Sequence, residues 1–282
     1  MELWLVEQHT PGYRVNWKLK RTIYTEKTPY QELAIVETVD FGRALVLDGI
    51  VQVTLDDEFI YHEMITHVPL FTHPNPKDVL VIGGGDGATV REILKHPQTN
   101  VDLVEIDERV INASRQYLPE IGKALDDPRV RIVVDDGIKY VKQTDKKYDV
   151  ILIDSSDPIG PATGLFSREF YQDVYRVLND DGLMVAQTES PLFNKELLAG
   201  VYQNLSEIFP LSRVYLTCIP TYIAGFWTFS LASKKYDPLQ LNPSSKDLSD
   251  MAFRYYTPAV HQAAFVLPRF VQEVLDGGKS AR

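Results

Sequence analysis

The sequence has a single cysteine, no long apolar run and fewer basic than acidic residues. Cys218 is the only cysteine among 282 residues, so no disulfide can form within the chain and no metal site with several thiolate ligands is possible. The 29 Lys and Arg residues against 39 Asp and Glu give a net charge of −10. This deficit argues against nucleic acid as a partner, because phosphates bind clustered positive charge. It is compatible with a cationic substrate.

The chain also lacks the features of a membrane protein. No segment approaches the ~20 consecutive apolar residues of a spanning helix. The start at Met1-Glu2-Leu3-Trp4 has no basic region ahead of an apolar run, as a secretory signal would have. We therefore expect a cytoplasmic protein that does not bind membranes.

The predicted elements divide the chain into two domains. Residues 1–60 contain strand-like segments separated by turns and predict a small N-terminal antiparallel β domain. Helical spacing runs from Phe59 to Val68, and Pro69 with His73-Pro74-Asn75-Pro76 is expected to end that helix. Residues 61–282 then alternate strands with helices, which predicts a Rossmann-like α/β domain with a mostly parallel sheet. A turn is expected at Asp180-Asp181-Gly182.

A glycine turn lies between the first predicted strand of the second domain and the helix after it. Its sequence is Gly83-Gly84-Gly85-Asp86-Gly87, and such a turn lets the backbone approach a nucleotide closely. Glu105 ends the next strand, where a carboxylate can accept hydrogen bonds from ribose hydroxyls. Together these residues predict a nucleoside site.

Asp86 restricts which nucleoside can bind. A carboxylate inside the glycine turn would repel a pyrophosphate or a free carboxylate, which disfavours NAD and intact S-adenosylmethionine. The expected ligand is a nucleoside that carries positive charge. At the end of the third strand, Asp136 is either an acceptor for an adenine amino group or a cap on the following helix.

The fourth strand ends in a polar loop that begins at Asp154 and contains Asp157. Carboxyl ends of strands in open α/β sheets bind ligands, although Asp, Ser and Pro are also ordinary loop residues.

Two histidines, His62 and His67, precede the glycine turn. They are five residues apart, so on a helix they point to different faces. A zinc pair is therefore not expected. We interpret His62 as a polar pocket residue and His67 as a core or surface histidine.

In this order, the motifs resemble those of spermidine synthases, the polyamine aminopropyltransferase family. The resemblance extends over nearly the whole chain, from Tyr30 to Pro268. It is carried by Val79 to Gly87 with Arg91-Glu92, by Glu105-Ile106-Asp107, by Asp136-Gly137, by Asp154 to Pro161 and by Ile219-Pro220-Thr221-Tyr222. It implies a small N-terminal β domain, a Rossmann-like methyltransferase-type domain and a homodimer or homotetramer.

The resemblance implies that decarboxylated S-adenosylmethionine, a co-substrate, donates an aminopropyl group to putrescine. Spermidine and 5′-methylthioadenosine are the products, Asp154 is the base, and no cofactor or metal is needed. The matching donor-binding residues are Gln31, Asp86, Glu105, Asp136, Gly137 and Pro161, and the matching polyamine-binding residues are Tyr61, His62, Asp154, Asp157 and Tyr222.

Other functions remain open at this point. Ile223-Ala224-Gly225 differs from the Pro-Ser-Gly of some relatives, so agmatine, cadaverine or spermidine are alternative acceptors. An S-adenosylmethionine-dependent diamine N-methyltransferase would share the domain, and Asp86 argues against it. A catalytically silent polyamine-binding protein is the alternative from outside the enzymes.

Overall fold

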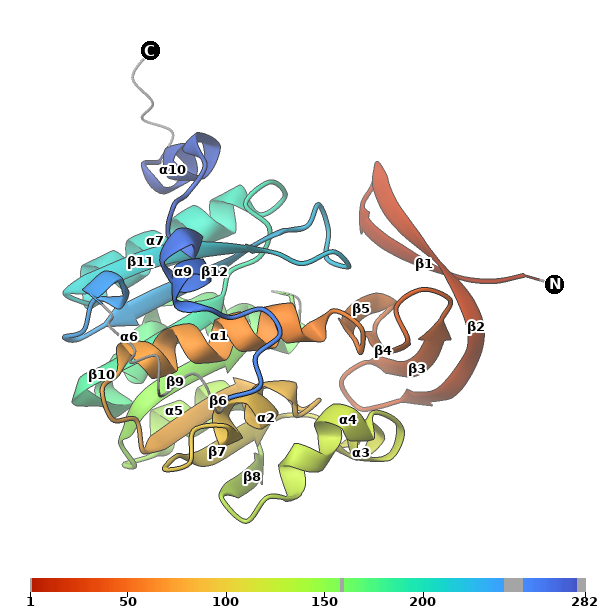
Figure 1. The fold of residues 1–282 in the computed structure, drawn as a ribbon, viewed down its shortest axis with the longest axis horizontal. Coiled ribbons are helices and arrows are strands. Elements are labelled where there is room, and N and C mark those ends of the chain that lie inside the picture. The colour runs from red at the N-terminus through yellow and green to blue at the C-terminus, as the bar shows by residue number, and fades with distance from the viewer. Residues whose placement is uncertain (1, 158–159, 241–250, 278–282) are drawn as a thin grey trace.

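The chain forms two β-sheets connected by a long helix. The computed structural model describes residues 2–157, 160–240 and 251–277, with backbone only at residues 160 and 161 (Figure 1). The small sheet ends at Thr54 and the connecting helix begins at Glu58, close to the predicted boundary at residue 60. The described elements are β1 (Leu3–Thr10), β2 (Tyr13–Lys27), β3 (Glu32–Thr38), β4 (Arg43–Leu47), β5 (Ile50–Thr54), α1 (Glu58–Thr72), β6 (Asp78–Gly83), α2 (Ala88–Leu94), β7 (Asn100–Glu105), α3 (Glu108–Tyr117), α4 (Pro119–Gly122), η1 (Lys123–Asp126), β8 (Val130–Val134), α5 (Gly137–Gln143), β9 (Tyr148–Asp154), η2 (Gly160–Phe166), α6 (Arg168–Val177), β10 (Leu178–Gln187), α7 (Lys195–Ile208), β11 (Leu211–Cys218), β12 (Phe226–Ser233), η3 (Pro238–Gln240), α9 (Pro258–Ala264) and α10 (Arg269–Leu275).

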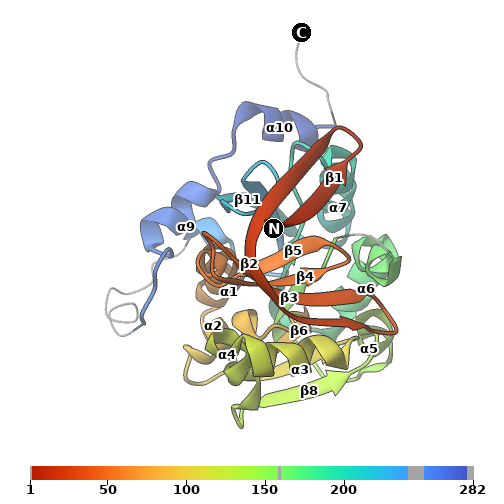
Figure 2. The same ribbon diagram turned by 90° about the vertical axis from the view of Figure 1, so that its right-hand side faces the viewer.

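The N-terminal sheet is antiparallel and keeps its strands in chain order, β1-β2-β3-β4-β5. Alternate residues point to opposite faces of a strand, so Ile35 and Leu45 pack on one side against Val110 of α3 and Ile121 of α4. This contact attaches the small sheet to the second domain. Figure 1 shows the small sheet at one end of the larger domain, and Figure 2 looks onto it.

The second sheet has the order β11-β12-β10-β9-β6-β7-β8. Its described strands all run in the same direction except β12, which runs in the opposite direction. Its strands are apolar on both faces because helices cover both. In β6, Val79 packs with the cluster that contains α1 and α2, whereas Leu80 packs with the cluster that contains α5 and α6. The predicted fold class is confirmed.

Two local predictions were wrong, the first of them in part. The helix α1 ends at Thr72, next to the predicted stop at His73-Pro74, but it does not end at Pro69. The flanking Val68 and Leu70 are buried, and this packing outweighs the one backbone hydrogen bond that proline cannot make. Asp180-Asp181-Gly182 is not a turn between elements but part of β10. There the register with β9 shifts between Leu178 and Leu183, so the strand carries an irregularity where a turn was expected.

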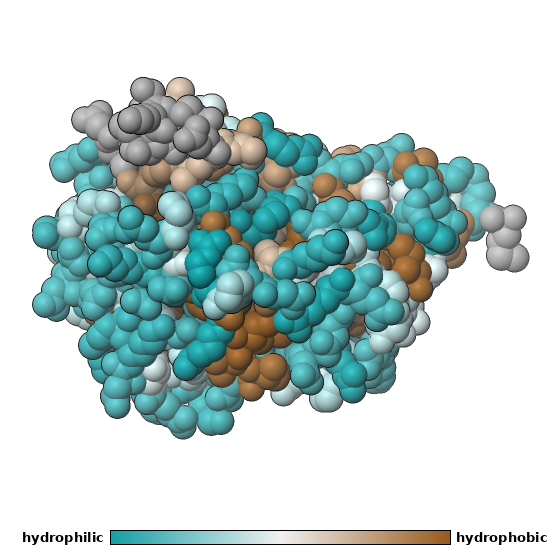
Figure 3. Space-filling model, turned by 60° about the horizontal axis from the view of Figure 1, so that its bottom comes forward, coloured by the Kyte–Doolittle hydropathy of each residue, from teal (hydrophilic) through white to brown (hydrophobic). Residues whose placement is uncertain are grey.

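Figure 3 shows a face on which hydrophilic side chains predominate around a central apolar group. Over the residues that the structure describes, no helix combines the length and the apolar character needed to cross a membrane.

Candidate active site

A cavity of about 610 Å³ lies where the small sheet faces the carboxyl ends of β6, β7 and β9. Ten of the eleven residues proposed from the sequence line it. These are Gln31, Tyr61, His62, Asp86, Glu105, Asp136, Gly137, Asp154, Asp157 and Tyr222. The eleventh, Pro161, belongs to η2, and its side chain lies outside the described residues.

The glycine turn packs directly against the end of β9. Gly83 has φ +81°, and a Cβ at this position would lie 2.1 Å from the carbonyl oxygen of Asp154. The next amide, Gly84 N, donates a hydrogen bond of 2.9 Å to that same oxygen. Glycine is needed here both for the backbone angle and for the close approach of two chain segments. The turn therefore holds Asp154 as well as bordering the cavity.

The carboxylate of Asp154 is oriented by two hydroxyl groups. Tyr61 Oη donates to Oδ1 over 2.7 Å, and Thr89 Oγ1 donates to Oδ2 over 2.6 Å. Each carboxylate oxygen has a second lone pair, so both can accept a further hydrogen bond from the cavity. The sequence analysis missed Thr89, although its place in the first turn of the helix after the glycine motif was a usable signal.

Glu105 is tied to the backbone beside the glycine turn. Its oxygens accept from Gly85 N over 3.2 Å and from Asp107 N over 2.9 Å. Burial raises the pKa of Glu105 to about 7. Gln31 donates through Nε2 to Asp107 Oδ2 over 2.9 Å, which links the N-terminal domain to the end of β7.

Asp136 and Gly137 line the cavity where β8 leads into α5. Asp136 caps α5, because its Oδ1 accepts from Ile138 N over 2.8 Å. The structure thus shows the helix-cap role of Asp136. A Cβ on Gly137 would lie 2.4 Å from Ile82 Cγ2, so glycine is needed for packing.

Asp86 and His62 form the charged pair nearest to Asp154. His62 Nε2 lies 3.9 Å from Asp86 Oδ1, and the same Asp86 oxygen accepts from Ala88 N. Burial disfavours a charged His62, but its hydrogen bond to Glu58 and the nearby acids outweigh that and raise its pKa to about 9. Burial also raises the pKa of Asp86.

A second acidic group lies at Asp157. Its carboxyl is hydrogen-bonded to that of Glu189, and burial raises the pKa of both, most strongly that of Glu189. Gln187 Nε2 donates to Glu189 Oε1 over 3.1 Å. The buried Glu7 of β1 lines the same region of the cavity and accepts from Trp17 Nε1. Glu7 and Glu189 were not predicted from the sequence. Glu7 lies inside a strand of the N-terminal domain, and Glu189 follows β10 without a glycine turn beside it.

Tyr222 lies in the turn between β11 and β12 and lines the cavity. Its hydroxyl donates to the carbonyl oxygen of Gln52 over 2.7 Å, and its ring lies 5.8 Å from that of Tyr61. Asp57 accepts from both the amide and the hydroxyl of Thr221, which attaches the turn to the start of α1. Burial raises the pKa of both tyrosines well above its usual range, so their hydroxyls are neutral donors.

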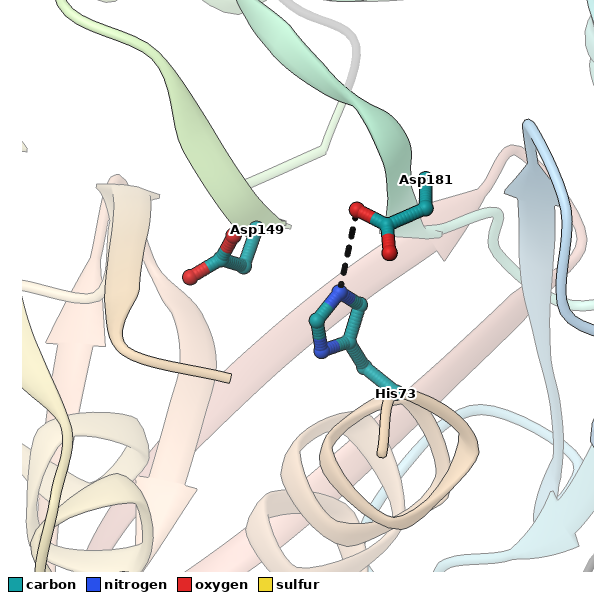
Figure 4. A group of neighbouring side chains, drawn as sticks. All are labelled: His73, Asp149 and Asp181. Carbon is teal, nitrogen blue, oxygen red and sulfur yellow. Dashed lines mark ion pairs between the residues drawn. The ribbon is translucent and has the colours of Figure 1, made fainter. Parts of the chain in front are cut away.

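Two histidine clusters lie outside the cavity lining. His67 is fully buried and contacts Glu92 through Nε2, as expected for a core histidine. The other cluster joins His73, Asp149 and Asp181 near the opposite end of the sheet, with His73 Nε2 3.7 Å from Asp181 Oδ1 (Figure 4). Asp149 accepts from two backbone amides and Asn179, which indicates a structural role.

Acidic groups predominate in the cavity. The described lining contains eight carboxylic acids, contributed by Glu7, Asp48, Asp86, Glu105, Asp136, Asp154, Asp157 and Glu189. The same described lining contains His9 and His62 but no Lys or Arg. Such a site favours a ligand with several positive charges.

Two family models match the chain. Residues 58–242 match the spermine/spermidine synthase domain, and residues 3–54 match the spermidine synthase tetramerisation domain. The two matches meet between β5 and α1.

Individual relatives agree over almost the whole chain. The polyamine aminopropyltransferase of Moorella thermoacetica is 58% identical over 97% of this chain and 96% of its own, and that of Caldicellulosiruptor saccharolyticus is 55% identical over 98% and 99%. A crystal structure of spermidine synthase with the transition state analogue AdoDATO superposes with a TM-score of 0.95 at 42% identity, covering 97% of this chain and 95% of that one. The spermidine synthase of Thermotoga maritima gives 0.93 at 42% identity, covering 97% and 94%. This chain therefore belongs to the spermine/spermidine synthase family and is an aminopropyltransferase-type transferase.

Proposed function

We propose that the protein is a spermidine synthase. It transfers the aminopropyl group of decarboxylated S-adenosylmethionine to putrescine and releases spermidine, 5′-methylthioadenosine and a proton. The observation that carries this proposal is the cavity lined by eight acids without a described Lys or Arg. Both substrates carry two positive charges, so the site complements each of them.

The donor fits the part of the cavity around the glycine turn. Glu105 can accept from the ribose hydroxyls, and Asp136 with Gly137 lies where the adenine would follow. Gln31 and Pro161 are proposed to contact the methylthioadenosine part. Asp86 would then bind the ammonium group, and it would repel the carboxylate of the intact, non-decarboxylated donor.

Asp154 is proposed as the base. An alkylamine has an unperturbed pKa of about 10.4, so putrescine arrives protonated and has no lone pair with which to attack. Asp154 takes one proton from the attacking ammonium group, and the freed nitrogen forms a bond to the aminopropyl carbon. The bond from that carbon to sulfur breaks, the sulfur keeps the electron pair, and neutral methylthioadenosine leaves. Tyr61 and Thr89 would hold the base in line. The sulfonium is already a good leaving group, so the proposal needs no metal or cofactor.

The other ammonium group of putrescine is proposed to bind beside Asp157. His62 and Tyr222 are proposed to contact the part of putrescine between Asp154 and Asp157. The neighbouring Glu189 strengthens this site, since two carboxyls that share a proton can release it to bind a cation.

The test is the release of methylthioadenosine from decarboxylated donor with putrescine, agmatine, cadaverine or spermidine, each at equal concentration. Intact S-adenosylmethionine serves as the control donor. Preference for putrescine supports spermidine synthase, and preference for another amine changes the acceptor only. Methyl transfer from the intact donor would release S-adenosylhomocysteine instead of methylthioadenosine, so S-adenosylhomocysteine from the intact donor alone would favour the N-methyltransferase. Donor binding without any product would favour the silent binding protein.

We also propose that the protein is a homodimer or homotetramer. The match to the tetramerisation domain covers β1 to β5. Within it, Leu3, Trp4 and Val6 of β1 are 44%, 47% and 49% exposed, which is unusual for apolar residues of one strand. Sedimentation of the wild type beside a Trp4→Lys variant tests this: the variant is expected to dissociate, and a monomeric wild type would contradict the proposal.

A further inference from the structure

The two ring nitrogens of His62 have different partners. Nδ1 faces two acceptors of Glu58, the backbone carbonyl at 2.7 Å and Oε2 at 2.9 Å. Because both partners are acceptors, Nδ1 carries a hydrogen whatever the charge of the ring. Any change of protonation must therefore occur at Nε2, which lies 3.9 Å from Asp86 Oδ1.

Glu58 is itself held by a guanidinium group. Arg91 Nη1 donates to Oε1 and Nη2 to Oε2, each over 2.9 Å, in the bidentate geometry that fixes a carboxylate plane. Burial opposes ionisation of Glu58, but the hydrogen bonds from His62 and Arg91 outweigh it and lower its pKa. Glu58 is thus a fixed negative charge behind the ring.

The remaining charges that face His62 come from two other elements. Asp86 belongs to the turn after β6 and Asp154 to the end of β9, and both are acids. Tyr61, beside it on α1, is neutral because burial raises its pKa. With no cation in the cavity, an imidazolium at His62 is the positive charge nearest to Asp86.

We propose that Glu58, fixed by Arg91, is a positioning residue that makes His62 an exchangeable cation. The proton on Nε2 balances Asp86 while the cavity is empty and leaves to solvent when the ammonium group of the donor binds Asp86. This rests on the proposed function, which assigns the donor's ammonium group to Asp86.

The proton on His62 Nε2 is expected to leave because it lies close to where the ammonium group binds Asp86. Nε2 lies 3.9 Å from Asp86 Oδ1, so an ammonium group that binds this oxygen on the side of the ring comes close to Nε2, where two positive charges disfavour each other. Once Nε2 has lost its proton, its lone pair can accept a hydrogen bond from the same ammonium group. The pKa of about 9 in the empty cavity means that the proton is present to be released at neutral pH.

The experiment counts protons released on binding, by calorimetry in buffers of different ionisation enthalpy at about pH 7.5. The probes are decarboxylated S-adenosylmethionine and 5′-methylthioadenosine. They share the nucleoside, and the donor adds the aminopropyl ammonium group and the positive charge on sulfur. A proton that Glu105 releases to the shared nucleoside cancels in their difference, and variants of Glu58 and His62 assign what remains. The wild type is expected to release about one more proton with the decarboxylated donor.

The variants assign that proton. Glu58→Gln keeps the side-chain shape and removes the charge, so the buried His62 becomes neutral before binding and the extra proton is lost. Glu207→Gln is the matched control, because Glu207 also pairs with an arginine but lies on the surface, and it should keep the extra proton. If Glu58→Gln does not fold, His62→Gln replaces it and must also lose the extra proton.

The outcomes separate this inference from the proposed function. A wild type that binds the decarboxylated donor with no more proton release than methylthioadenosine refutes the exchange and leaves the proposed function intact. An extra proton that persists in Glu58→Gln, or in His62→Gln, refutes the assigned roles. Failure of the decarboxylated donor to bind at all would overturn both proposals.

Discussion

Asp154→Asn tests the proposed base with the least disturbance of the site. The asparagine oxygen can still accept from Tyr61 Oη, and its amide can donate to the hydroxyl of Thr89, so the side chain should keep its place. What is lost is the ability to accept a proton. A positioned base contributes typically about 10²- to 10⁴-fold, which corresponds to about 3 to 5 kcal/mol of the activation barrier.

We therefore expect turnover to fall by about 10²- to 10⁴-fold while donor affinity changes little, since Glu105 and Gln31 do not contact Asp154. Single-turnover release of methylthioadenosine measures the first quantity, and calorimetry with the decarboxylated donor measures the second. Asp145→Asn is the control, because Asp145 is an exposed acid just before the same strand and lies outside the cavity lining. Turnover of Asp154→Asn within about tenfold of the wild type would remove Asp154 from the role of base.

Three further predictions follow from the same geometry. Asp157→Asn should raise the KM for putrescine by about 10- to 100-fold without changing donor affinity. Because the pKa of both Asp157 and Glu189 is raised, the wild-type KM for putrescine should also increase as the pH falls. Steady-state kinetics should show a weaker dependence of KM on pH in Asp157→Asn, and an equal dependence would contradict the role of Asp157. Gly83→Ala should lower the melting temperature by at least about 4 °C, since its Cβ would lie 2.1 Å from a carbonyl oxygen, whereas Gly200→Ala, with open space around it, should not; equal melting curves would refute the packing argument. Buried His96 has a pKa of about 3, so the unfolded chain binds its proton more tightly: its contribution to stability is complete above about pH 6.5 and is lost as the pH falls towards 3. Urea unfolding at several pH values should show that the free energy of unfolding depends less on pH in His96→Asn than in the wild type. An unchanged dependence would mean that His96 does not contribute to it.

Much of the site could be predicted because it depends on local sequence. Parallel strands end at one edge of a sheet, so Gly83, Glu105, Asp136 and Asp154 had to lie near one another once each strand was identified. The glycine turn and the acid within it are also local features, and they indicated a cationic nucleoside without any knowledge of the fold. The structure brings these residues to one cavity.

The local pattern failed where packing overrides it. Pro69 is an ordinary helix breaker, yet α1 passes through it because that part of the helix is buried. There the surroundings of the segment, and not its own residues, decide the conformation. Helix α7 is a different case: it was not identified, although its buried residues Leu198, Val201 and Leu205 have the spacing of one helix face.

What the sequence alone determined is the alternation of strands and helices around the glycine turn, the acidic character of the chain and the carboxylates at the strand ends, because these are properties of neighbouring residues. The tertiary structure decided the rest. Only folding brings Glu7 of β1 and Glu189 after β10 into the same cavity, and only the packing of α1 on α2 lets Arg91 fix Glu58 behind His62. These contacts join residues far apart in the chain, and their charges and pKa shifts arise from burial, which no local pattern specifies.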